Sequence, residues 1–157
     1  MENKIGNIVL EGAKLIFRNF QGKVSQYNKN GEKTVGVLLP DDIAMQAEAD
    51  GWKVKHLNPR EDDPEQYRQP WLPVKLSYKF YPPTVVLITN RGKTILNEDG
   101  IGMLDWANIQ NVDIVIRPYA YPGVNGGPSG ISAYVKSLYV TIQEDEFADK
   151  YADLPTA

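Results

Sequence analysis

The chain has 157 residues and a net charge of −3, with 42% hydrophobic and 24% charged residues, which fits one globular domain that buries its own core. It contains no cysteine, so disulfides and thiolate metal sites are excluded. The first residues hold no stretch of signal-peptide type, and the longest apolar run, 85–88, is far below the ~20 residues of a membrane helix. We therefore expect a cytoplasmic protein that does not enter a membrane.

The negative charge is concentrated at the C-terminal end. Residues 143–157 carry five acids and one lysine, a net charge of −4, so residues 1–142 carry +1. No carboxylate occurs between Gly12 and Gly31 or between Gln66 and Asn97, and both stretches hold several lysines and arginines. Such asymmetry bears on binding partners and not on the fold. It indicates a body with basic patches, followed by an acidic tail.

The first part of the chain is predicted to hold strands and one short helix. Branched and aromatic residues indicate strands at 7–20 and 33–39, separated by a turn that contains Asn30-Gly31. Asp41 or Asp42 is expected to cap a helix over 43–49, which Gly51 ends.

The middle of the chain is predicted to form two further strands around a polar loop. Residues 52–57 are a candidate strand, and 58–70 form the loop. Alternation over 72–80 then places apolar and polar side chains on opposite faces of a strand. In this register Tyr78 and Phe80 belong to the core.

The last part of the chain is again rich in strand patterns. The predicted elements, in chain order, are a strand at 84–89, a turn at 90–93, helical turns at 100–107, and strands at 112–119 and 131–142 on either side of a glycine-rich loop at 121–130. The helical turns are expected to carry Met103, Leu104 and Trp106 into the core. The apolar parity of the last strand changes near Ser137, as a β-bulge would produce.

These elements predict a mainly β fold, either a small barrel or a sandwich, with one short helix, long loops and a disordered acidic C-terminal tail. Of the two we expect an OB-type small barrel. We expect an OB-like domain over 1–142 and the tail over 143–157. High net charge with few apolar residues favours disorder in such a tail.

The sequence lacks the residue patterns of a catalytic site. Its single histidine, His56, lies among lysines and is expected to be a solvated surface residue. Glu98, Asp99, Asp105 and Asp113, with Lys93 upstream, form an acidic group that a magnesium-dependent nuclease would need. Turn and helix-capping roles explain Asp99 and Asp105 more simply. We expect a protein that is not an enzyme and that uses no cofactor and no metal.

Cations and aromatic residues occur together, as in proteins that bind single-stranded nucleic acid by phosphate contacts and base stacking. Side-chain parity assigns Phe17 to the core with Leu15, and Phe20 to the polar face with the cations. The residues predicted to contact phosphates are Lys14, Arg18, Lys75, Lys79, Arg91, Lys93, Arg117 and Lys136. Those predicted to stack on bases are Phe20, Tyr81, Tyr119 and Tyr134.

Four segments, 13–20, 51–61, 86–119 and 131–146, resemble the single-stranded DNA-binding proteins of tailed bacteriophages. The resemblance implies a decorated OB barrel with an acidic C-terminal tail and a non-enzymatic role in phage DNA replication or recombination, in the host cytoplasm. It also implies that the tail contacts replication proteins such as a polymerase or helicase. The tail residues expected to do so are Glu144, Asp145, Glu146, Phe147, Asp149 and Tyr151. One difference is that the tail ends in Asp153-Leu154-Pro155-Thr156-Ala157, whereas bacterial-type tails end on an aromatic residue.

Several alternatives remain open at this stage. The ligand is single-stranded DNA or RNA, bound without strong sequence preference, and the protein is a monomer or a homodimer. A protein-binding or virion-assembly module on a similar β fold is a second interpretation, because tyrosine and arginine are also enriched at protein interfaces. A metal-dependent nuclease is the third.

Overall fold

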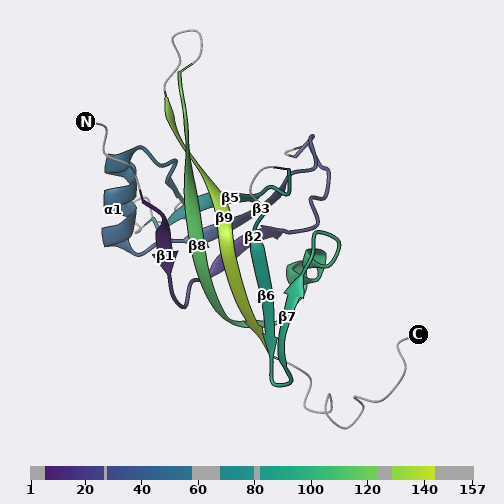
Figure 1. Ribbon diagram of the computed structural model, residues 1–157. Helices are drawn as coiled ribbons and strands as arrows, with labels where there is room; N and C mark the ends of the chain where they lie inside the picture. Colours follow the sequence, from purple (N-terminus) through teal and green to yellow (C-terminus); the bar gives the residue numbers. More distant parts are fainter. Residues whose placement is uncertain (1–5, 27, 58–67, 80–81, 124–128, 144–157) are drawn as a thin grey trace, which may run out of the picture.

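A computed structural model describes residues 6–26, 28–57, 68–79, 82–123 and 129–143 (Figure 1). The elements are β1 (Ile8–Leu10), β2 (Leu15–Asn19), β3 (Lys33–Leu38), α1 (Asp41–Asp50), β4 (Lys55–His56), β5 (Pro70–Leu76), β6 (Thr84–Thr89), β7 (Gly92–Leu96), the 3-10 helix η1 (Ile101–Asp105), β8 (Ile109–Tyr121) and β9 (Gly130–Ile142). Neither helix of the described residues is long and apolar enough to cross a membrane. The predicted mainly β fold with one α-helix is confirmed.

The strands form one strongly branched sheet. Its main order is β1-β8-β9-β5-β3-β2, and β8 and β9 pair antiparallel over almost their whole length. On its other side β9 pairs in parallel with two strands in succession, first β5 and then β6, and β7 pairs with β6. Figure 1 shows β8 and β9 as long, curved strands that rise beyond the rest of the sheet.

The two ends of this order are consecutive in the chain. Instead of the single predicted strand over 7–20, the chain forms β1, which pairs with β8, and β2, which pairs with β3. The break lies at Gly12, whose φ of 63° is in the left-handed region that glycine adopts readily. The Ala13 amide still donates to the Val112 carbonyl at 2.8 Å. The ladder itself does not close, so the sheet is an open one.

Helix α1 begins at Asp41, and its N-cap is Pro40, without a side-chain cap hydrogen bond. The prediction that Asp41 or Asp42 caps the helix is therefore wrong. Both aspartates lie in the first turn, where a negative charge is stabilised by the helix dipole. Gly51 ends the helix as predicted, with φ 102° and its amide donating to the carbonyls of Ala47 and Glu48.

The core is filled by alternating side chains from the curved sheet. Strand β5 has a strict alternation of buried and half-buried residues, and it runs from Pro70 to Leu76 where 72–80 was predicted. The fully buried large side chains include Phe20, Leu39, Leu72, Ile101, Leu104, Ile114, Ile116 and Leu138. Tyr78 packs partly buried against this core, as predicted, and Phe80 lies outside the described residues. Of the three residues expected to enter the core from 100–107, only Leu104 does so, because this segment forms a 3-10 helix whose threefold repeat leaves Met103 and Trp106 exposed.

Two bulges set which side chains face outward. In β9, Ser137 pairs with Val115 and Val135 with Ile116, so Lys136 is the extra residue, and the bulge predicted near Ser137 is confirmed. In β2, two residues, Phe17 and Arg18, span the register step that one residue, Val35, spans on β3. A bulge reverses the parity of all residues after it. The sequence pattern did not reveal this second bulge.

Candidate nucleic-acid interface

The β2 bulge turns Phe17 out of the core. Phe17 was predicted to be buried, but 63% of it is exposed, and Phe20, which was predicted to stack on bases, is fully buried. Both expectations are wrong for one reason, the reversal of parity at the bulge. Phe17 is also the only non-glycine among the described residues with a positive φ, 49°. This backbone conformation costs about 1–2 kcal/mol of stability, which the rest of the fold must offset.

Phe17 lies against Trp71. Trp71 is one of the half-buried residues of β5, whose side chains point outward. Their ring centroids are 5.0 Å apart, with an interplanar angle of 61°. A Cβ atom on Gly36 would lie 2.8 Å from Ile16 Cγ1 and 2.9 Å from Trp71 Cε3, so the indole crosses β3 where that strand has no side chain. An edge-to-face pair of this kind stabilises the orientation of both rings.

Two lysines approach the aromatic rings from the segment that follows α1. Lys55 pairs with Trp71 in the β4–β5 ladder, and its Nζ lies 5.7 Å from the indole centroid. The Lys53 Nζ lies 4.6 Å from the ring centroid of Tyr121, at the end of β8. Both distances are in the range of cation–π contacts. The arrangement places a cation beside each of two flat rings on the outer side of the sheet.

A row of outward side chains crosses the three central strands. Lys75 of β5 is the register partner of Tyr134 of β9, and Tyr134 is the partner of Arg117 of β8. Directly paired residues point to the same side of a sheet. The ring of Tyr119, which is 58% exposed, meets that of Tyr134 with centroids 6.1 Å apart. The row therefore alternates cation, aromatic and cation, with a second aromatic attached.

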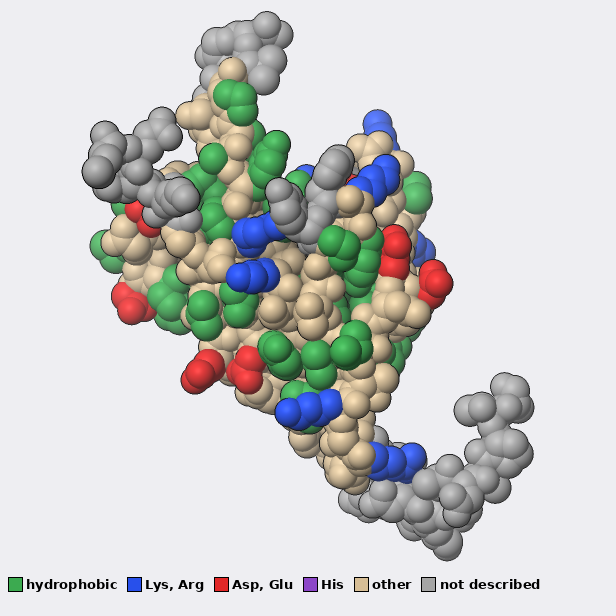
Figure 2. All heavy atoms as spheres, in the orientation of Figure 1, with side chains coloured by type: hydrophobic (Ala, Val, Ile, Leu, Met, Phe, Trp, Pro, Cys, Tyr) green, Lys and Arg blue, Asp and Glu red, His purple; other side chains and the backbone are tan. Residues whose placement is uncertain are grey.

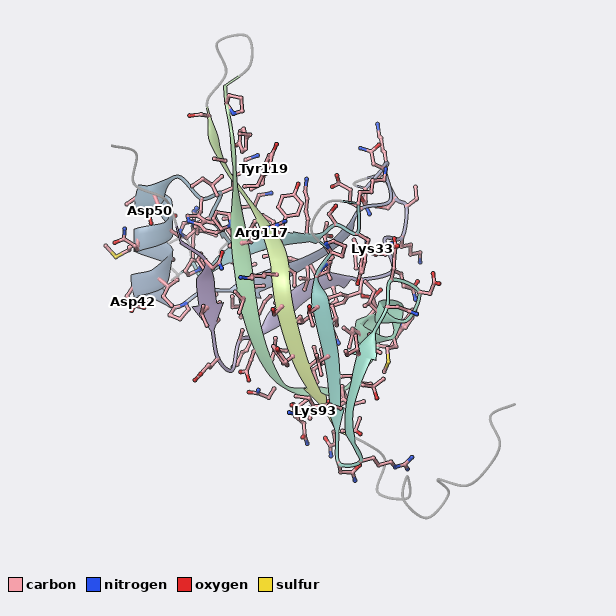
Figure 3. The ribbon with its side chains drawn as sticks, in the orientation of Figure 1. Lys33, Asp42, Asp50, Lys93, Arg117 and Tyr119 are labelled. Atoms are coloured by element: carbon pink, nitrogen blue, oxygen red, sulfur yellow. The ribbon has the colours of Figure 1, made fainter. Side chains whose placement is uncertain are left out.

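We call these outward side chains of β2, β4, β5, β8 and β9 and of the segment before β4 the aromatic–cation face; its members are Phe17, Lys53, Lys55, Trp71, Lys75, Arg117, Tyr119, Tyr121 and Tyr134. Figure 2 shows lysine and arginine side chains between hydrophobic ones in the middle of the view, over β8 and β9. Figure 3 shows Arg117 and Tyr119 in succession along β8. Lys136, the bulge residue of β9, is exposed two residues after Tyr134.

Other predicted contact residues lie elsewhere. Arg18 Nη1 donates hydrogen bonds of 2.9 Å to the carbonyls of Leu104 and Ala107, which ties β2 to η1. Lys14 and Arg18 line a pocket beside the beginning of β8, at the opposite end of that strand from Tyr119.

The cations of the β6–β7 hairpin form a separate group. Arg91 and Lys93 are exposed at this hairpin, and Figure 3 shows Lys93 well separated from Arg117 and Tyr119. Lys79 is exposed and lines a cleft beside Lys75. Tyr81 and the tail residues Glu144, Asp145, Glu146, Phe147, Asp149 and Tyr151 lie outside the described residues.

Sequence reasoning missed Phe17, Lys53, Lys55, Trp71 and Tyr121 as members of this face. A signal existed for Trp71, because extending the alternation of 72–80 by one residue places it in phase with Pro73 and Lys75. No comparable signal existed for Phe17, since it depends on the bulge. Lys55 joins the face through the β4–β5 pairing, and Lys53 through its neighbour Trp52, which bridges Ile131 of β9. Sequence spacing reveals neither contact.

Two of the acids weighed for a nuclease, Asp105 and Asp113, are part of the scaffold. Asp105 accepts hydrogen bonds from the amides of Phe20 and Gln21, and Asp113 accepts one from Gly12. His56 is half-exposed, with its Nε2 3.5 Å from Glu48 Oε1. Within the described ranges no three His, Cys, Asp or Glu residues come together as metal ligands would.

Comparison with known proteins gives a family and a fold. A family model described as a putative phage ssDNA-binding domain matches residues 1–157. No curated protein matches the chain.

Solved structures of one bacteriophage protein resemble this chain. The single-stranded DNA-binding protein from bacteriophage Enc34 in complex with ssDNA has 16% sequence identity and a TM-score of 0.54, over 90% of this chain and 89% of that chain. A C-terminal truncation of the Enc34 protein has 16% identity and a TM-score of 0.55, over 89% and 87% of the two chains. At these identities the likeness concerns the fold.

Proposed function

Because the chain belongs over its whole length to the family of putative phage ssDNA-binding domains, it is a single-stranded DNA-binding protein, and we propose that it holds the strand on the aromatic–cation face. The family also agrees with the expectation of a binding protein rather than an enzyme. The Enc34 protein, whose fold is similar, has been solved in complex with ssDNA.

The observation that carries the proposal is the contact of flat rings with cations on one outer surface. Bases stack on aromatic rings with about 1–3 kcal/mol per base, whatever their identity, and lysine and arginine neutralise the phosphates between them. Trp71 with Phe17 and Tyr134 with Tyr119 offer two such platforms. Lys55 and Arg117 lie beside them. This mixture suits a strand of any sequence.

The role in the cell follows from the same inference. A protein of this kind coats exposed single strands during phage DNA replication or recombination, in the cytoplasm of the host. Residues 144–157 contain five acids and one lysine, which suits contact with basic surfaces of replication proteins.

A titration of fluorescently labelled oligo-dT tests the proposal. We expect binding that weakens as salt rises, with a slope in log–log form of about −0.7 for each phosphate neutralised. Double-stranded competitor should displace the oligonucleotide poorly, because paired bases cannot stack on the protein. Affinity weaker than about 100 μM at low salt would contradict the proposal, since non-specific binders already reach that range. Oligo-U in the same titration tests RNA, and sedimentation of the free protein tests the homodimer.

A further inference from the structure

A cleft of about 500 Å³ adjoins the aromatic–cation face where β9 passes from β5 to β6. Its walls are the turn before β3 and the first residue of that strand (30–33), the end of β5 with the residues after it (75–79), Glu98 and Tyr134. Tyr134 and Lys75 line the cleft and also belong to the row across β5, β9 and β8. The cleft is therefore continuous with the aromatic–cation face and is not a separate pocket.

The cleft holds three lysines, and two of them are ion-paired with glutamates. Lys33 Nζ lies 3.4 Å from Glu98 Oε1, and Lys75 Nζ lies 3.5 Å from Glu32 Oε2. The third, Lys79, is exposed. With the two carboxylates counted, the net charge of the cleft is +1.

Both ion pairs are of the kind that is easily exchanged. The glutamate side chains are 54% and 46% exposed, so each carboxylate can return to water when it leaves its lysine. Exposed pairs at such distances contribute little to stability, because water and salt screen them. Lys33 is the more buried of the two lysines: it is 21% exposed, and its Cγ would lie 3.2 Å from a Cβ on Gly22. Packing therefore holds the Lys33 side chain more firmly than that of Glu98. Lys75, at 43% exposed, is about as exposed as Glu32.

The other wall residue with an unusual environment is Tyr78. Burial raises the pKa of its hydroxyl above the ordinary value of 10.0, and the charge of Glu98 adds to that rise. Tyr78 therefore stays neutral at physiological pH, and the electrostatics of the cleft are set by the lysines and the two glutamates.

We propose that this cleft binds phosphate groups of the DNA strand as the DNA leaves the aromatic–cation face. In the free protein, Glu32 pairs with Lys75 and Glu98 pairs with Lys33, so the two carboxylates take the places of those phosphates. The inference rests on the proposed function, because it extends the path of the same DNA. On binding, a phosphate oxygen replaces each carboxylate oxygen at the lysine, and the carboxylate turns to solvent. The glutamates thereby weaken binding and reduce its dependence on salt.

Neutralising the glutamates tests the inference. Glu32→Gln and Glu98→Gln should each tighten oligo-dT binding about two- to fivefold, the range that an exposed ion pair spans. The salt slope should become steeper by up to about 0.7 for each lysine released. Glu11→Gln is the matched control, because it makes the same charge change at an exposed residue between β1 and β2, outside the cleft.

A double-mutant cycle separates a local exchange from a general charge effect. In a Lys33→Gln background, Glu98→Gln should lose its gain and match Glu11→Gln. The inference is overturned if neither Glu32→Gln nor Glu98→Gln raises the affinity for oligo-dT more than Glu11→Gln does. It is also overturned if Glu98→Gln still raises the affinity in the Lys33→Gln background.

Failure of this inference is distinguishable from failure of the proposed function. If Trp71→Ala weakens oligo-dT binding and the glutamate variants behave as Glu11→Gln does, the aromatic–cation face is supported as the DNA-binding surface and the cleft is rejected as a phosphate site. If Trp71→Ala leaves binding unchanged, the face itself is rejected. Urea unfolding of each variant establishes that it is folded before titration.

Discussion

The Phe17 ring meets the Trp71 indole edge-on across an intervening strand, with 5.0 Å between centroids. Phe17 is on β2 and Trp71 on β5, and β3 lies between them in the sheet. The contact exists because β3 presents Gly36 at this point and because the β2 bulge turns Phe17 outward. Two rings from strands that are not paired with each other thereby form one platform at the edge of the cation row.

Replacing Trp71 by alanine should weaken ssDNA binding. Loss of one stacking platform costs about 1–3 kcal/mol, which is roughly a five- to 150-fold rise in Kd. Fluorescence anisotropy with labelled oligo-dT measures the change. Trp106→Ala is the matched control, since this tryptophan is 73% exposed and follows η1, outside the aromatic–cation face. Equal losses from both variants would argue against a defined platform.

The two phenylalanines of the β2 region should behave in opposite ways. Phe20→Ala removes a fully buried ring and should lower the free energy of unfolding by about 3–5 kcal/mol. Phe17→Ala should lower it by only about 0.5–1.5 kcal/mol, the contribution of an aromatic pair, while it weakens DNA binding. Urea unfolding and the oligo-dT titration together measure the contrast. The reverse result would mean that the bulge is absent in solution.

Gly36→Ala should damage both stability and binding. The new Cβ would lie within 3.0 Å of Ile16 and Trp71, so the indole must move or β2 must shift. Overpacking of this kind costs about 1–3 kcal/mol. Thermal unfolding and anisotropy measure the two effects. Gly6→Ala is the control, because nothing lies within 4 Å of a Cβ at that position, and it should change neither quantity.

Lys55 and Lys93 should differ in their effect on salt dependence. Lys55→Gln removes a cation of the face and should reduce the slope of log K against log salt by about 0.7. Lys93 at the β6–β7 hairpin was also predicted to contact phosphate, and the structure separates it from the face (Figure 3). Lys93→Gln should therefore change the slope less. If Lys93→Gln has the larger effect, the strand follows the hairpin and not β5, β9 and β8.

Stability should fall at high pH in a way that depends on Tyr78. Burial raises the pKa of its hydroxyl above 10.0, so in the pH range just above 10.0 the unfolded chain loses a proton that the folded chain keeps. This contribution to stability is complete below that pH and is lost as pH rises through the folded-state value. Tyr78→Phe should flatten the fall in the urea midpoint above about pH 10. Tyr119→Phe, at an exposed tyrosine, is the control and should leave it unchanged.

The local patterns of the chain were enough to predict its class and much of its secondary structure. Alternation in β5, the helix end at Gly51 and the parity change near Ser137 each depend on neighbouring residues alone, and all three are confirmed. The cations and aromatics that indicated a nucleic-acid ligand are likewise a property of composition, and the family match agrees with that ligand.

Only the tertiary structure decided which of these cations and aromatic residues lie side by side on the surface. A bulge in β2 exchanges the roles of Phe17 and Phe20, and it arises from the register in which β2 pairs with β3, the next strand of the chain. Lys75, Tyr134 and Arg117 form one row only because β9 lies between β5 and β8. The ladders that align them join residues up to about sixty positions apart, and the short-range periodicity of a sequence carries no information about such register.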